Sequence, residues 1–172
     1  RRVLAEGAYS AALIPVFSGV VLNPKDEREA SDFVENTTSM LLFATVVLTI
    51  LFFFGMPYII QVLAPGFTDN KEAYELAVHF GKIIFPYIIF ISLAAHFTSI
   101  NNVHERFAAG AFAPAILNIT FILSLFFLTP FVTTAGHALS YGVLIGGILQ
   151  FLYLYRSVLN FYRPRIRLPV LN

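Results

Sequence analysis

Three long stretches of the sequence contain no Asp, Glu, Lys or Arg, and this feature constrains the fold more than any other. They cover residues 36–68, 83–104 and 107–155. A helix on the surface of a soluble protein shows polar side chains on every turn. A helix that crosses a hydrocarbon core of about 30 Å needs about 20 consecutive apolar residues instead. We therefore predict membrane-spanning helices rather than the buried core helices of a large soluble protein.

Composition agrees with this prediction and excludes several classes of protein. The chain is 58% hydrophobic and 12% charged, whereas soluble domains average about 45–50% apolar and about 25% charged residues. A net charge of +1 excludes a polybasic nucleic-acid binder. The absence of cysteine from the sequence excludes disulfides, thiolate zinc sites, iron–sulfur clusters and a cysteine nucleophile. No HExxH or HxxxH spacing occurs, so we expect no metal and no cofactor.

The apolar segments predict an all-α, polytopic membrane helix bundle. The first segment begins with Arg1 and reads as the remainder of a helix cut from a longer, two-lobed transporter chain. A charged connector is expected over residues 23–36, and Asp69 is expected to cap a helix after the Pro65-Gly66 turn. Prolines within apolar segments are expected to bend them. The sequence predicts one partial and four complete spans, over residues 1–20, 37–64, 70–101, 107–128 and 137–160.

The distribution of basic residues predicts the orientation of the chain. Short cytoplasmic loops carry an excess of Lys and Arg. One side of the predicted bundle carries Lys71 and Lys82. The other side, which includes the 23–36 connector and the C-terminal tail, is therefore expected in the cytoplasm; it carries Lys25, Arg28, Arg106, Arg156, Arg163, Arg165 and Arg167.

The strongest candidate site lies in the first ten residues. Arg2, Glu6 and Ser10 are spaced at i, i+4 and i+8, so they share one helix face, and Arg1 adjoins it. Charges at membrane depth are unfavourable and usually face a wet cavity or a partner. A guanidinium binds phosphate oxygens bidentately, which suits a phosphate-bearing substrate. The alternative is that both arginines extend to the membrane interface and pair with Glu6.

Other polar residues in the spans favour packing over chemistry. His96 could relay protons, but its own helix core lacks a carboxylate, which favours a hydrogen-bonded packing histidine. Asn101, Asn118 and Gln150 are expected to bond between helices, and Gly142-xxx-Gly146 serves either dimerisation or internal packing. No Ser-His-Asp set, nucleotide loop or pair of catalytic carboxylates is visible, so we do not expect an enzyme.

Three segments resemble a known family. RRVLAEGAYSAALIPVFS at 1–18 is similar to the second-helix signature of the MurJ (MviN) lipid II flippases, which typically read RR-x-x-AEGAFS-x-AF-x-P. APGF at 64–67 and FPYIIFISLAAHFTSINNVHERFAAGAFAPAILNI at 85–119 resemble later helices and turns of the same family. Tyr9, Gly19 and Ile100 depart from the usual pattern without removing a candidate site residue.

The resemblance implies a function. The family belongs to the multidrug/oligosaccharidyl-lipid/polysaccharide exporter superfamily, with two lobes around a central cavity. The resemblance implies a flippase that moves lipid II across the bacterial cytoplasmic (inner) membrane by alternating access. It also implies that Arg1 and Arg2 are cations of the cavity and that Glu6 lies near a lateral portal. Its expected partners are lipid II, membrane lipids and the cell-wall synthesis machinery. The alternatives are a related polysaccharide-lipid or drug exporter, and a structural or scaffolding membrane protein.

Overall fold

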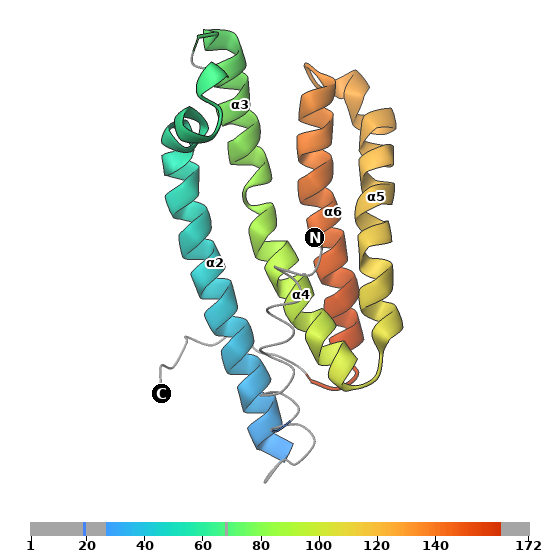
Figure 1. The fold of residues 1–172 in the computed structure, drawn as a ribbon. Coiled ribbons are helices and arrows are strands. Elements are labelled where there is room, and N and C mark those ends of the chain that lie inside the picture. Colours follow the sequence, from blue (N-terminus) through green and yellow to red (C-terminus); the bar gives the residue numbers. More distant parts are fainter. Residues whose placement is uncertain (1–18, 20–26, 68, 163–172) are drawn as a thin grey trace.

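The computed structural model describes residue 19 and residues 27–67 and 69–162, and within them every regular element is helical. The all-α prediction is confirmed. In chain order, the elements are α2 (Glu27–Leu63), η1 (Pro65–Phe67), α3 (Lys71–Ile84), α4 (Tyr87–Val103), α5 (Phe107–Leu128), η2 (Thr129–Phe131) and α6 (Ala135–Val158) (Figure 1).

Four helical segments of the described chain are long and apolar enough to cross a membrane: Arg28–Leu63, Lys71–Val103, Phe107–Phe131 and Ala135–Val158. They run up and down, with α6 packed on α4 and α5 and α2 packed on α3 and α4. The start of α2, the α4–α5 link and the end of α6 lie at one end of the bundle, which we call the α4–α5 end (Figure 1). The α2–α3 and α5–α6 links lie at the opposite end, which we call the α5–α6 end.

Helix α2 starts ten residues earlier than the predicted span of 37–64. It begins at Glu27, so residues 27–36, expected as a connector, form its first turns. This segment contains no Gly or Pro and places Glu29 in the first turn, where acidic residues stabilise a helix. Ala30 and Val34 are buried on its inner face. The charged residues of this segment therefore indicate exposure to water and do not mark the end of the helix.

The segment predicted as one helix over 70–101 is two helices separated at Phe85–Pro86. Pro86 has no N–H to donate, and the turn is closed instead by hydrogen bonds from Phe85 N to Gly81 O (2.9 Å) and from Ile88 N to Phe85 O (3.0 Å). The cap of α3 is Asn70 rather than the predicted Asp69, because its side chain accepts a 3.1 Å hydrogen bond from Ala73 N. By contrast, α5 covers the range expected for its segment.

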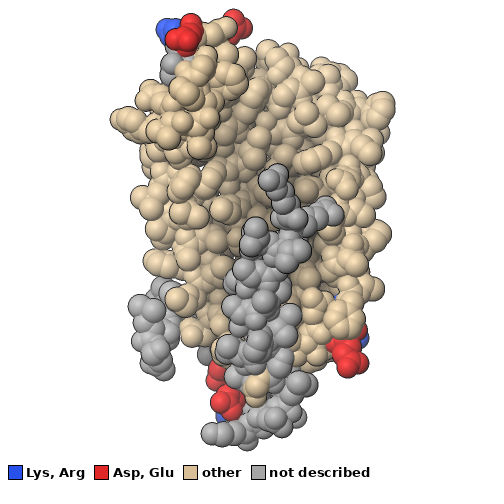
Figure 2. Space-filling view, viewed as in Figure 1, with Lys and Arg blue, Asp and Glu red and all other residues tan. Residues whose placement is uncertain are grey.

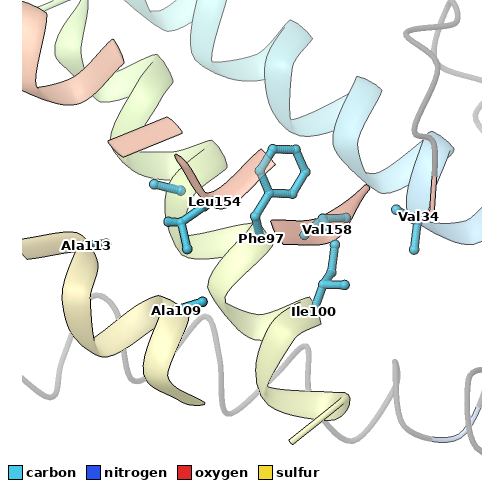
Figure 3. Packing of buried hydrophobic residues seen from close by; sticks show 8 residues of the cluster. Val34, Phe97, Ile100, Ala109, Ala113, Leu154 and Val158 are labelled. Atoms are coloured by element: carbon cyan, nitrogen blue, oxygen red, sulfur yellow. The ribbon is translucent and has the colours of Figure 1, made fainter. Parts of the chain in front are cut away.

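The hydrophobic core of the described residues sits toward the α4–α5 end. Figure 3 shows Phe97 and Ile100 of α4 beside Leu154 and Val158 of α6, with Val34 of α2 closing one side. Ala109 and Ala113 of α5 belong to the same cluster; as small residues, they let α5 approach closely.

The outer surface is apolar between the two ends. Large hydrophobic side chains are exposed along α2 and α5, including Phe54 (74%) and Phe126 (74%). In the space-filling view, the described charged side chains in sight lie at the two ends, with uncharged surface between them (Figure 2). A soluble monomer rarely exposes such a surface. The pattern fits a bundle whose sides face lipid.

Glycines of α6 allow its neighbours to approach closely. A Cβ atom at Gly146 would lie 2.7 Å from Leu117 Cδ1 of α5, and one at Gly147 would lie 2.5 Å from Tyr87 Cδ2 of α4. Gly142 faces Ser124 of α5 in the same way. Of the two roles left open for Gly142-xxx-Gly146, the structure therefore supports internal packing.

Candidate functional site

The candidate site predicted from the sequence consists of Arg1, Arg2, Glu6 and Ser10. All four lie outside the described residues. Their role in a cavity stays a prediction. The polar residues of the described helices can be assigned individually.

The interior of the bundle contains many polar side chains. The buried polar side chains come from α2, α4, α5 and α6. Most of the hydroxyls bond to a carbonyl of their own helix, as in Thr45 Oγ1 to Leu41 O (2.8 Å) and Thr120 Oγ1 to Ile116 O (2.8 Å). Such bonds satisfy the hydroxyl in an apolar environment. These residues therefore explain how the spans tolerate polar groups, and offer no chemistry.

His96 is completely buried between α4 and α2. Its Nε2 lies 3.1 Å from Thr38 Oγ1, and the ring tautomer decides which group donates. Its ring also lies beside that of Phe97, with centres 5.7 Å apart. The structure supports the expected hydrogen-bonded packing role.

Glu35 is a buried carboxyl that sequence reasoning assigned to a solvated connector. It lies one turn before Thr38 on α2 and is 6% exposed. The signal that could have found it is the spacing of Ala30, Val34, Glu35 and Thr38, which places all four on or beside one helix face. That face turns inward, toward the core at the α4–α5 end.

Asn101 and Gln150 form the hydrogen bonds between helices that were expected of them. Asn101 Oδ1 accepts from Ser157 Oγ of α6 at 2.5 Å, and its Nδ2 donates to Phe97 O at 2.8 Å. Gln150 Nε2 of α6 donates to Ala113 O of α5 at 2.8 Å. Gln150 Oε1 is buried with no hydrogen-bond partner among the described residues.

Asn118 differs from these two residues. It lies halfway along α5 and is exposed, and within the described part of the chain its amide forms no hydrogen bond to another helix. An amide that faces hydrocarbon without a partner is unfavourable by several kcal/mol. Asn118 is therefore expected to meet polar surroundings in the complete protein, either a wet cavity or another helix.

Lys82 is a charged residue within a candidate span, and sequence reasoning counted it with Lys71 on one side of the bundle. It lies in the last turn of α3 and is half-buried. Its Nζ is 5.2 Å from the centre of the Phe53 ring of α2, a cation–π contact. The sequence obscured this placement because Lys82 directly precedes a charge-free run and therefore resembled the edge of a span.

An aromatic and basic cluster joins the α4–α5 link to the chain after α6. The His104 ring stacks on Phe161 with centres 3.9 Å apart, and the Arg106 guanidinium lies 4.8 Å from the same ring. His104 Nε2 is 3.3 Å from Tyr162 Oη. Burial, and then the charge of Arg106, lower the pKa of His104, while burial raises the pKa of Tyr162. His104 is thus half-buried.

Comparison with known proteins assigns the family. The model of the family described as "Lipid II flippase MurJ" matches residues 1–169. "Lipid II flippase MurJ" of Burkholderia cenocepacia is 34% identical over 152 residues, covering 88% of this chain and 29% of that protein. "Probable lipid II flippase MurJ" of Rhizobium tropici is 36% identical over 163 residues, covering 92% of this chain and 30% of that protein.

A third relative, "Probable lipid II flippase MurJ" of Rhizobium meliloti, is 34% identical over 176 residues, covering 96% of this chain and 33% of that protein. The chain therefore spans about a third or less of the length of these curated relatives. The match nevertheless includes all the described helices as well as the predicted site residues. On this basis, the chain belongs to the MurJ family of lipid II flippases.

Proposed function

We propose that this chain supplies the helices of an N-terminal lobe in a transporter that moves lipid II across the bacterial cytoplasmic membrane. The observation that carries the proposal is the family match over residues 1–169, together with relatives that bear the lipid II flippase name. Four apolar spans with lipid-facing sides are consistent with it. These findings favour a flippase over a drug exporter, a scaffolding protein or an enzyme.

The substrate explains why such a lobe needs cations. Lipid II carries a pyrophosphate, and transferring a charged headgroup through hydrocarbon without compensation is very unfavourable. A wet cavity with fixed positive charges replaces the water and counterions that the headgroup loses. Arg1 and Arg2 would contact the phosphate oxygens as bidentate donors, with Glu6 and Ser10 on the same helix face.

Two described residues are further candidates for this cavity. Lys82 is a cation within a span, and its Nζ lies over the aromatic ring of Phe53. Asn118 presents an exposed amide halfway along α5. Both positions would be unfavourable against lipid and favourable against water or a polar headgroup.

The proposed orientation places the α4–α5 end in the cytoplasm. Arg28, Arg106 and Arg156 lie near that end among the described residues, whereas Lys71 starts α3 at the other end. The excess of basic residues supports a cytoplasmic location for residues 23–36 and for the C-terminal tail. The α4–α5 end would then also be the surface available to cytoplasmic members of the cell-wall synthesis machinery.

The test is a lipid II leaflet-accessibility assay in cells depleted of their own flippase and complemented by the full-length parent protein. We expect the parent to restore outward exposure of lipid II and Arg1→Ala to abolish it at equal membrane abundance. Arg156→Ala is the matched control, because Arg156 is an exposed arginine in the last turn of α6. A well-inserted parent that leaves lipid II inside would refute the function. If Arg1→Ala restores the outward exposure of lipid II as well as Arg156→Ala does, only the role of Arg1 is refuted.

A further inference from the structure

Two histidines from different helices lie against each other at the α5–α6 end of the bundle. His79 is an exposed residue of α3, and His137 is a half-buried residue in the first turn of α6. Their ring centres are 5.2 Å apart and their planes are inclined by 52°. The proposed transport of lipid II uses neither residue, so the pair calls for a separate explanation.

The surroundings of His137 hold its ring in place. Thr134 Oγ1 lies 2.9 Å from His137 Nδ1, and the Phe80 ring meets the imidazole edge-on with centres 4.9 Å apart. Phe80 in turn packs closely on Gly136, where a Cβ atom would lie 2.7 Å from Phe80 Cζ. Metal-binding histidines are usually oriented through the ring nitrogen that does not bind the metal. The hydroxyl engages Nδ1 and leaves Nε2 as the ligand atom.

The two rings are close enough to share a metal ion. With a Zn–N bond of about 2.0 Å and about 1.1 Å from nitrogen to ring centre, two imidazoles at a tetrahedral angle have centres about 5.1 Å apart. The observed separation is 5.2 Å. His79 is exposed, so its side chain can turn to direct a nitrogen at the metal without displacing packed neighbours.

We propose that His79 and His137 form a binding site for a divalent transition metal ion, with Zn²⁺ and Cu²⁺ as the favoured ions. Imidazole nitrogens prefer these ions to Mg²⁺ or Ca²⁺. Within the described residues no group of three or more His, Cys, Asp or Glu could share a metal, so water fills the remaining positions. The ion bridges α3 and α6 and restrains their relative movement at this end.

The chemistry of the ligands sets the conditions of binding. Each imidazole must be neutral to coordinate, so metal and protons compete. A site with two protein ligands is also expected to release its metal readily to a chelator, unlike a four-ligand structural zinc site.

The experiment titrates the purified full-length protein, freed of any affinity tag, with Zn²⁺ alone in competition with a chromogenic chelator. We expect His79→Gln and His137→Gln each to lose one equivalent of Zn²⁺, or to weaken its binding at least tenfold. His104→Gln is the matched control and should bind as the unmodified protein does. Thr134→Ala should weaken binding without removing the site, because it removes only the group that orients His137.

The folding of each variant is checked by its melting temperature without metal. Zn²⁺ should raise the melting temperature of the unmodified protein and of His104→Gln, and should leave that of His79→Gln and His137→Gln unchanged. Equal zinc binding in all four proteins would overturn the proposal. A loss in His104→Gln as large as that in His79→Gln would also overturn it, because the effect would then not belong to this pair.

Discussion

Replacing Gly147 by alanine tests whether α6 is packed on α4 as closely as the structure indicates. The new Cβ atom would lie 2.5 Å from Tyr87 Cδ2, 2.9 Å from Tyr87 Cε2 and 3.3 Å from Phe90 Cβ. To reach the 3.4 Å at which ordinary contact begins, the Tyr87 ring must retreat by 0.9 Å, the difference between 3.4 and 2.5 Å. Overpacking of this kind is destabilising by about 1–3 kcal/mol.

Gly55 provides the matched control. It is also a glycine inside a span, but a Cβ atom there would meet only Ile59 Cδ1 of its own helix, at 3.9 Å. Gly→Ala gains up to about 1 kcal/mol of helix propensity at either position, so this gain cancels in the comparison. The difference between the two variants isolates the helix–helix contact, and we expect Gly147→Ala to be about 1–3 kcal/mol less stable than Gly55→Ala.

The assay is reversible unfolding of the full-length protein in mixed micelles with increasing SDS, followed by the loss of tertiary signal. Both variants and the unmodified protein are compared in the same detergent. A Gly147→Ala variant as stable as Gly55→Ala, or more stable, would refute the close approach of Tyr87 to Gly147.

Two further predictions concern polar contacts. Gln150→Leu should change the free energy of unfolding by less than about 1 kcal/mol, because the lost hydrogen bond to Ala113 O is offset by removal of the unpartnered Oε1. Asn101→Leu loses its hydrogen bonds to Ser157 and to Phe97 O, and should be destabilising by about 1–2 kcal/mol in the same SDS assay. Because the pKa of His104 is lowered in the folded state, its stabilising contribution is present above pH 6.5 and is lost as the pH falls through the folded-state pKa. The amide protection factors of residues 104–107, corrected for intrinsic exchange, should therefore fall on acidification. His104→Phe should remove this dependence.

The membrane spans could be predicted from the sequence because a helix surrounded by lipid must consist mainly of apolar residues. The range expected for α5 is the one observed, since Arg106 and the Thr129-Pro130 pair mark its two ends. The start of α2 was not predictable in this way. Charged residues indicate that a segment is exposed to water, but a segment exposed to water can still be helical. Proline was equally ambiguous: α2 and α5 continue through Pro57 and Pro114, whereas Pro86 separates α3 from α4.

The surroundings of individual polar residues depend on contacts that no local sequence pattern contains. Asn101 and Asn118 are the same residue type in similar apolar surroundings, yet one is buried against Ser157 and the other is exposed. Glu35 is buried because α2 begins early and turns that face toward the core. The proximity of His79 to His137 follows from the packing of α3 on α6, which residues 58 positions apart in the sequence do not reveal.

The central claim is that the complete protein moves lipid II between leaflets. The most direct measurement reconstitutes the purified full-length parent into proteoliposomes that contain fluorescent lipid II, and follows the fraction that an impermeant quencher can reach. The account predicts that this fraction rises in the presence of the protein, that Arg1→Ala prevents the rise, and that a labelled lipid without the pyrophosphate headgroup does not move. Correctly inserted protein that leaves lipid II in its original leaflet, or that moves both lipids equally, would contradict the account.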